Sequence, residues 1–450
     1  MNRMKRHFTA PARFVSVALA LLACTSAESE NAGVGGAGGG SLPPPSERPS
    51  CTSSTPPTGG TPPARADTAA ALSSDSRTMV MFGGDVATVI CGDIPKRQHV
   101  GDTWVLDTAC GGWSDLSAKV GTAAPSPRAR HAMALDVARG RALLFGGRFR
   151  SGDSGDYTLY NDVWAFEFAT ESWSLVAAMG TAPSPRANTA IAVDGDTLYA
   201  FGGNTSKSGL SFVPTNDLFA LDLVSNAWSA VAAGGVLPAP REFHAMAVDA
   251  SEHRVYVAHG ADENALLGPF FSDAHVFDAP SASWHPLAAA MPAAAPEGRI
   301  KGGLALRAHA GEPRQLLFVG GHDDGALGNR NDVLALDVPE GADLATLGPL
   351  TWQARIAGDA LHSPANGQCD FPADFVTLDT TSVERRSAFA FAPTASGEAF
   401  VVFAGDSDCG RLNDAWWFDT RSGEFTPIQE TLPGLTCPRT GSSTCAGLCG

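Results

Sequence analysis

The stretch PRARHAMALDVARGRALLFGGRFRSGDSGDYTLYNDVWAFEFATESW, Pro127–Trp173, consists of short apolar runs separated by turn-forming residues. The second run ends at Gly146-Gly147, Asn161-Asp162 begins the third run, and the fourth contains Trp173. Runs of this length between Gly-Gly and Asn-Asp pairs are typical of short β-strands joined by turns and loops. The stretch therefore predicts four consecutive strands.

The same pattern occurs six times along the chain. The Gly-Gly position is occupied in turn by Gly83-Gly84, Gly146-Gly147, Gly202-Gly203, His259-Gly260-Ala261, Gly320-Gly321 and Ala404-Gly405. In five of the six copies an aromatic residue follows the motif Asp by 11 residues, as Trp173 follows Asp162. A four-stranded unit of about 55 to 60 residues cannot bury both faces of its sheet alone, so the copies must pack together around a ring. We therefore predict an all-β fold, a six-bladed β-propeller of four-stranded blades over residues 64–430.

The repeats resemble those of the kelch family. The Gly pair after the second strand, the Asn-Asp pair before the third and the Trp in the fourth carry this resemblance, which extends from Arg65 to Phe425. It implies a propeller in which the start of each innermost strand faces a central pocket. The resemblance leaves the activity open, because kelch propellers serve as adhesion, scaffold and enzyme domains.

The charge balance excludes one class of partner. The chain has 31 Lys and Arg against 47 Asp and Glu, a net charge of −16. An acidic surface repels phosphate backbones and anionic headgroups. We therefore expect no nucleic-acid partner.

Residues 1–23 have the features of a signal peptide, a basic start followed by the apolar run Phe14–Ala23. This run is too short to span a bilayer stably. The sequence Leu21-Leu22-Ala23-Cys24 is similar to the lipobox of bacterial lipoproteins, which predicts lipidation of Cys24. The alternative is an ordinary signal peptide that is cleaved near Ala23.

Residues 24–63 are rich in Gly, Pro, Ser and Thr and predict a disordered linker. With the lipid anchor, they indicate an exported protein of the cell envelope, tethered to the outer membrane or the cell surface. The membrane is then reached only through the anchor.

The cysteines indicate an oxidising compartment. Apart from Cys24 there are eight, an even number suited to disulfides. Three lie in a Cys-rich tail, residues 431–450, which has no histidine to complete a zinc site. We predict a Cys369–Cys409 bridge between loops on one face, with Cys91 pairing with the tail or with Cys51.

The two faces of the predicted ring differ. Loops after the second and fourth strands emerge on one face, and the segment between the Gly-Gly position and the Asp varies from 17 to 8 residues. The turn between the third and fourth strands is nearly constant. The long-loop face is therefore the expected ligand-binding face.

A repeated arginine precedes the innermost strand of five copies, and the sixth copy offers Glu384 or Arg385. The five are Arg65, Arg128, Arg186, Arg241 and Arg299. Either they converge on the channel mouth as an anion site, to which His322 could contribute, or each pairs with an acidic residue of a neighbouring blade and holds the ring together. The motif Asp and the tryptophans are assigned to turns and to packing.

Two functions are compatible with these residues, besides a purely structural role in the cell envelope. The first is a binding module for a protein, peptide or carbohydrate ligand on the long-loop face. The second is an enzyme, an epimerase or isomerase acting on an anionic sugar at the arginine-lined mouth, with Glu384, His322 or His362 as acid or base. No pattern of histidines or cysteines marks a metal site, and we predict no cofactor, metal or catalytic residue. A calcium site at Asp323, Asp324, Asp406 and Asp408 is a weaker alternative than a solvated acidic rim.

Overall fold

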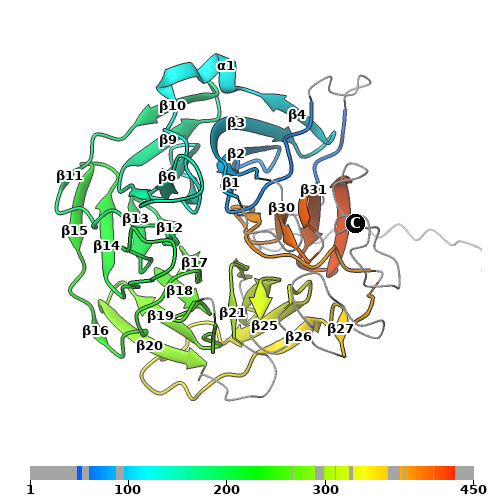
Figure 1. Ribbon diagram of the computed structural model, residues 1–450. Coiled ribbons are helices and arrows are strands. Elements are labelled where there is room, and N and C mark those ends of the chain that lie inside the picture. The colour runs from blue at the N-terminus through cyan, green and yellow to red at the C-terminus, as the bar shows by residue number, and fades with distance from the viewer. Residues whose placement is uncertain are drawn as a thin grey trace, which may run out of the picture. The chain divides into compact units, whose positions relative to one another are not determined.

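A computed structural model describes residues 48–52, 60–87, 96–265, 267–288, 298–309, 311–323, 328–362, 376–379, 381–408 and 410–430. Within them, six sheets of antiparallel strands are arranged in a ring around a central axis (Figure 1). The prediction of a six-bladed all-β propeller is confirmed. Cys24, Cys91, Asp324, Cys369, Cys409 and the tail lie outside the described residues.

Each blade is continuous in sequence, and its first strand is the innermost. Blade 1 contains β1 (Ala69–Leu72), β2 (Thr78–Asp85), β3 (His99–Asp107) and β4 (Gly112–Asp115). Blade 2 contains β5 (Ala132–Asp136), β6 (Arg141–Phe145), β9 (Val163–Glu167) and β10 (Ser172–Leu175). Blade 3 contains β12 (Ala190–Asp194), β13 (Thr197–Phe201), β14 (Leu218–Asp222) and β15 (Ala227–Ala230).

The second half of the ring repeats this order. Blade 4 contains β17 (Ala245–Asp249), β18 (Arg254–Ala258), β19 (Ala274–Asp278) and β20 (Ser283–Ala288). Blade 5 contains β22 (Gly303–Arg307), β23 (Arg314–Val319), β25 (Val333–Val338) and β26 (Gln353–Ile356). Blade 6 contains β29 (Ala390–Pro393), β30 (Ala399–Ser407), β31 (Gly410–Asp419) and β32 (Glu424–Gln429).

Short strands and helices lie outside the four main strands of each blade. β11 (Met179–Gly180) and β16 (Gly234–Gly235) add a parallel strand to the outer edges of blades 3 and 4. Two-stranded pairs form between β7 (Arg148–Phe149) and β8 (Thr158–Leu159), β21 (Arg299–Ile300) and β24 (His322–Asp323), and β27 (Ala360–Leu361) and β28 (Val376–Thr377). The helices are α1 (Ser117–Val120) and the 3-10 helix η1 (Gly121–Ala123). No helix in the described part of the chain is both long and apolar enough to cross a membrane.

The hydrophobic core lies between the blades. Six clusters of buried side chains each combine residues of two adjacent blades, and one of them joins blade 6 to blade 1. In that cluster Leu72 and Met79 of blade 1 pack with Val401 and Trp417 of blade 6. Because each sheet hides its apolar faces against its two neighbours, the blades depend on one another, as a stacked repeat requires.

The spaced tryptophan connects each outer strand to the preceding blade. Trp173 of blade 2 is buried, packs edge-on against Phe82 of blade 1 at 5.4 Å, and donates a hydrogen bond to Thr103 Oγ1 at 3.0 Å. The equivalent pairs are Trp113 with Phe403, Trp228 with Phe145, Trp284 with Phe201 and Trp352 with His259. The 11-residue offset therefore places a tryptophan at four of these interfaces, whereas Trp352 follows Asp332 by 20 residues. The packing role of the tryptophans is confirmed.

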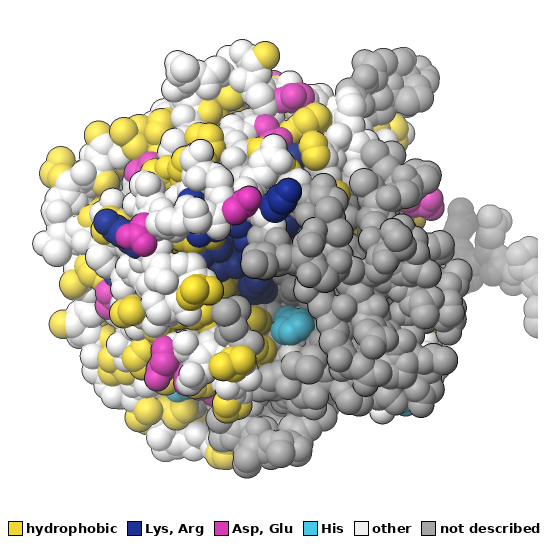
Figure 2. Space-filling model, viewed as in Figure 1, with side chains coloured by type: hydrophobic (Ala, Val, Ile, Leu, Met, Phe, Trp, Pro, Cys, Tyr) yellow, Lys and Arg dark blue, Asp and Glu magenta, His cyan; other side chains and the backbone are white. Residues whose placement is uncertain are grey.

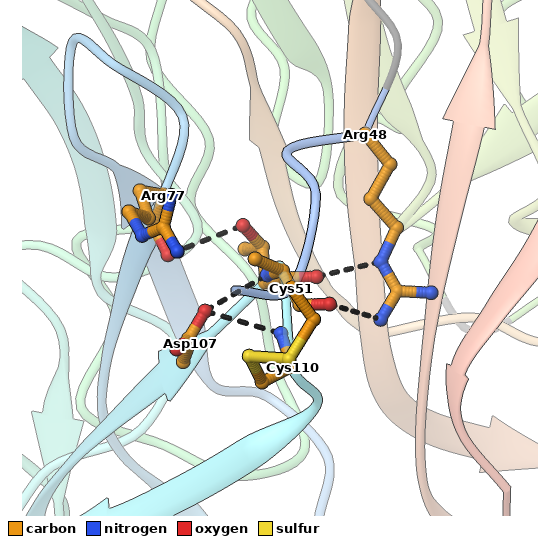
Figure 3. The surroundings of a disulfide bond; sticks show 7 residues. Arg48, Cys51, Arg77, Asp107 and Cys110 are labelled. Atoms are coloured by element: carbon orange, nitrogen blue, oxygen red, sulfur yellow. Dashed lines mark hydrogen bonds between the residues drawn. A yellow bond between two sulfur atoms is a disulfide. The ribbon is translucent and has the colours of Figure 1, made fainter. Parts of the chain in front are cut away.

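A short strap, residues 48–52, lies on the side of the ring where blade 6 meets blade 1. A disulfide joins Cys51 to Cys110, in the turn between β3 and β4 (Figure 3). Arg48 donates to the carbonyl oxygens of Thr108 at 2.6 Å in blade 1 and of Pro427 at 2.9 Å in blade 6. Cys51 is thus not the partner of Cys91, which corrects that alternative. The strap belongs to the predicted linker, yet it is bonded to both blade 1 and blade 6.

Candidate functional site

The repeated arginine forms a bidentate ion pair with the motif aspartate of its own blade. In blade 2, Arg128 Nη1 lies 2.6 Å from Asp162 Oδ1, and Nη2 lies 2.9 Å from Oδ2. The six pairs are Arg65–Asp102, Arg128–Asp162, Arg186–Asp217, Arg241–Asp273, Arg299–Asp332 and Arg386–Asp414. Each Nη1 also donates to the carbonyl of the first residue of the Gly-Gly position, as Arg128 does to Gly146 at 3.0 Å. The guanidiniums are buried and bonded by the chain itself.

These pairs differ from the sequence-based expectations in three respects. The arginines pair within a blade, not across to a neighbour, because the second strand places its end between Arg and Asp. The sixth arginine is Arg386, neither Glu384 nor Arg385, since it stands four residues before β29 as Arg128 stands four before β5. The motif aspartate binds a guanidinium and does more than stabilise a turn.

The second glycine of each Gly-Gly pair links neighbouring blades. Gly147 has φ of +100°, and its amide donates to the carbonyl of Arg186 in blade 3 at 2.9 Å. A Cβ at Gly147 would lie 2.9 Å from the Cβ of His131, so a larger residue does not fit. The motif residues thus build the ring and are not available to a ligand.

The residue two positions after each repeated arginine differs in type from blade to blade. These residues are Asp67, Arg130, Asn188, Phe243, Lys301 and Ala388, and all have left-handed φ values between 55° and 59°. Their backbones form a closed circle, in which each N–H donates to the carbonyl oxygen of the equivalent residue in the preceding blade at 2.8 to 3.3 Å. We call these six residues the inner ring. Their geometry is repeated, but their side chains are all different.

The inner ring surrounds a cavity at the centre of the long-loop face. The cavity has a volume of about 120 Å³ and is lined by the six inner-ring residues and their immediate successors, including His131, Thr189 and His244. Figure 2 shows Lys and Arg side chains gathered near the middle of this face. A channel mouth with convergent polar groups is the usual place for a ligand in a propeller.

Positive charge prevails in the cavity. Asp67 accepts a hydrogen bond from Arg130 Nε at 2.8 Å, so this acid and base balance each other. Burial raises the pKa of Asp67, but the charges of Arg130 and Lys301 outweigh burial and hold the pKa well below its ordinary value. The Nζ of Lys301 lies 5.1 Å from the centroid of the Phe243 ring, and no carboxylate of the described residues is bonded to it. Burial lowers the pKa of Lys301 to about 8.

Two further ionisable groups adjoin the cavity. Arg148 stacks on Tyr157 at 4.0 Å, and burial together with Arg130 lowers its pKa to about 9, so it stays charged at neutral pH. Glu242 is fully buried and accepts a hydrogen bond from Asn188 Nδ2. Burial raises the pKa of Glu242 to about 7, against the opposing effects of Asn188 and Arg130. Near neutral pH the site therefore holds an excess of cations within an acidic protein.

The other predicted candidates lie elsewhere. His322, in β24, has its Nδ1 3.4 Å from Asn329 Oδ1 and does not line the cavity. Glu384 and His362 are also absent from the lining. His131 and His244 do line it, but burial lowers the pKa of both to about 3. The described residues contain no cluster of acids, histidines or cysteines suited to a metal ion.

The inner ring, and not the repeated arginines, is the part of this site that can contact a ligand. The repeated arginines are bonded internally, and Glu242 is too deeply buried to reach a proton on a substrate. The residues that do face the cavity, Arg130 and Lys301 among them, escaped the sequence analysis because they share no residue type. Their signal was positional: a variable residue at a constant offset from a repeated arginine.

Comparison with known proteins agrees with the architecture. A model of the KLHDC2/KLHL20/DRC7 kelch-repeats domain matches residues 48–210 and 87–321, together more than half of the chain. The chain belongs to the kelch-repeat family. Kelch propellers generally serve as protein-interaction modules, and this is the class of function that the fold supports.

Several curated proteins are similar over part of the chain. Acyl-CoA-binding domain-containing protein 4 of Arabidopsis thaliana is 31% identical over 229 residues, which are 49% of this chain and 30% of that protein. N-(sulfonatooxy)prop-2-enimidothioate sulfolyase of Thlaspi arvense is 33% identical over 164 residues, 35% of this chain and 42% of that protein. The dynein alpha chain of the flagellar outer arm of Chlamydomonas reinhardtii is 30% identical over 223 residues, 46% of this chain and 4% of that protein. The chain thus covers less than half of each of these relatives.

Proposed function

We propose that this kelch-repeat protein is an exported, lipid-tethered binding module that takes a protein or peptide ligand on its long-loop face, with an anionic group of the ligand in the central cavity. The inner ring carries this proposal, because six equivalent positions present six different side chains to one cavity. Lys301 supplies a cation that forms no salt bridge among the described residues, although the charges of Asp67 and Asp406 act on it, and Arg148 adds a second positive charge nearby. A carboxylate entering the cavity would meet this excess of positive charge.

A peptide fits this face better than a carbohydrate. Sugar-binding surfaces commonly use exposed aromatic platforms, and the nine tryptophans of the chain are all buried or half-buried. The half-buried Trp164 and Trp416 donate from Nε1 to the motif aspartates Asp162 and Asp414, at 2.8 and 2.7 Å. Packing and these hydrogen bonds account for the tryptophans.

Export and tethering rest on the N-terminal sequence and on the disulfide. The Cys51–Cys110 bond is of the kind that persists in an oxidising compartment. Replacing Cys24 with Ser is expected to move the protein from the membrane to the soluble fraction after cell fractionation. Unchanged membrane association of Cys24→Ser would contradict the lipid anchor.

The binding proposal is tested by selecting peptides from a random phage library on the folded protein. We expect sequences with Asp or Glu to be enriched on the wild type and to be lost on Lys301→Met, which removes the cation with little change in volume. Lys207→Met, an exposed lysine in a loop of the same face, is the matched control and should select the same peptides as the wild type. Equal enrichment of acidic peptides on Lys301→Met, or no enrichment at all, would overturn the proposal.

A further inference from the structure

Two loops beside the cavity carry exposed apolar side chains. Leu210 is 90% exposed and Val213 is 53% exposed in the loop between β13 and β14, and Leu267 is 86% exposed in the loop between β18 and β19. Both loops belong to the long-loop face of adjacent blades, 3 and 4. We call these three residues the apolar ledge. Exposed leucines grouped beside a cavity are typical of interaction sites.

The ledge is continuous with the wall of the cavity. Phe243 of the inner ring packs against Phe212 with ring centroids 6.3 Å apart, and Phe212 lies between Leu210 and Val213 in the chain. Phe212 and Phe243 form a cluster with Ala265, which is two residues before Leu267. This cluster is separate from the six interblade clusters, and it joins the loops of the ledge to Phe243 of the inner ring.

The loops that carry the ledge are held by hydrogen bonds. In the first loop, the amide of Val213 donates to Asn204 Oδ1 at 2.8 Å, and the amide of Tyr157 in blade 2 donates to the carbonyl of Lys207 at 2.9 Å. In the second, the amide of Leu267 donates to the carbonyl of Asn264 at 2.7 Å. A ledge fixed in this way loses little conformational entropy when a ligand covers it.

Cations lie next to both the cavity and the apolar ledge. Blades 1 and 2 place Arg97 and Arg148 near Asp67. Arg150 stacks on Tyr157 at 4.3 Å, beside Gly209 of the loop that carries Leu210. Positive charge and exposed apolar side chains are therefore neighbours at this rim. Other exposed apolar side chains, such as Leu175 and Met179, lie on or next to the outermost strands and away from the cavity.

From this arrangement we propose that the partner is a protein segment that presents a carboxylate to the cavity and an apolar side chain, within a few residues of it, to the apolar ledge. The inference rests on the proposed function and specifies its ligand. Charge complementarity with the cavity and continuity through Phe243 select this occupant over a purely acidic peptide, which would leave the ledge exposed, and over a purely apolar one.

The experiment uses the phage-selected acidic peptides on the full chain. In these peptides we expect a Leu, Ile, Phe or Met at a constant spacing from the acid. Binding by fluorescence anisotropy should weaken about tenfold for the double variant Leu210→Ser/Leu267→Ser, the effect of losing burial of one apolar side chain. The matched control, Leu175→Ser/Val224→Ser, removes two exposed apolar side chains elsewhere and should bind like the wild type.

The outcomes separate the two proposals. Acidic peptides without a spaced apolar residue, bound equally by the ledge variant, would overturn the ledge and leave the cavity proposal intact. Loss of acidic selection altogether would overturn both. If sedimentation without peptide shows self-association that Leu210→Ser/Leu267→Ser abolishes, a second copy of the chain covers the ledge and the peptide proposal is wrong.

Discussion

In every blade the repeated arginine and the inner-ring residue are two positions apart, yet the arginine is bonded within its blade and the inner-ring residue lines the cavity. Arg299 is bonded to Asp332 of its own blade, whereas Lys301 lines the cavity and forms no salt bridge in the described part of the chain. Identical chemistry at the first position builds six similar blades, and varied chemistry at the second lines one cavity, to which we assign the selectivity for a ligand. In a propeller, a residue type that repeats is a sign of architecture, and a position that repeats with changing residues is a sign of function.

The largest expected difference between the two sets of residues is in the free energy of unfolding. Arg386→Met leaves the buried Asp414 carboxylate without its guanidinium, and we expect the free energy of unfolding to fall by about 3 to 5 kcal/mol. Lys119→Met, which breaks an ion pair with Glu171 at the surface, should cost less than about 1 kcal/mol. Urea unfolding followed by tryptophan fluorescence measures both. Equal losses in the two variants would show that the repeated pairs are not special to the architecture.

A smaller effect concerns the glycine that links neighbouring blades. Gly147→Ala places a Cβ against His131 at a left-handed φ, and we expect a loss of about 1 to 3 kcal/mol. Gly152→Ala also has a positive φ, but nothing lies within 4 Å of its Cβ, so it should lose only about 1 kcal/mol for the backbone. Thermal unfolding of the two variants distinguishes the clash from the backbone cost. A Gly147→Ala protein as stable as Gly152→Ala would contradict the tight approach between the blades.

The smallest effect concerns the inner ring and is a change of affinity with pH. Glu242 has a raised pKa of about 7 and Lys301 a lowered pKa of about 8. As the pH rises through these values the first group gains a negative charge and the second loses its positive charge, so an acidic peptide should bind more weakly. Glu242→Gln, which keeps an acceptor for Asn188, should remove the part of the fall near pH 7. Glu424→Gln, at an exposed residue of β32, should leave the profile unchanged.

Glu242 also links this pH range to folding. Its folded pKa lies above the ordinary value of 4.5, so the folded state binds the proton more tightly than the unfolded state does. The stability that this proton provides is present below about pH 4.5 and is lost as the pH rises toward about 7. The Glu242→Gln protein should show a flatter dependence of unfolding free energy on pH across this range, and an unchanged slope would contradict the raised pKa.

The sequence predicted the ring because the features that build it are periodic. Trp173 and its equivalents recur at a constant offset, and the requirement that thin sheets share their apolar faces follows from this repetition. The inner ring was missed because Asp67, Phe243 and Lys301 have nothing in common except their place. The Cys51–Cys110 bond was not predicted because the position of the strap depends on tertiary contacts of Arg48. No local sequence pattern encodes these contacts.

The central claim is that ligand affinity resides in the inner ring and stability in the repeated arginines. The most direct test compares Arg299→Met with Lys301→Met, two substitutions in one blade, by measuring unfolding free energy and the affinity for a selected acidic peptide. We predict that Lys301→Met weakens binding at least about tenfold with stability unchanged or raised, because a partly desolvated cation is removed, and that Arg299→Met lowers stability by about 3 to 5 kcal/mol. A stable Arg299→Met protein that loses the peptide, or a Lys301→Met protein that binds it normally, would contradict the account.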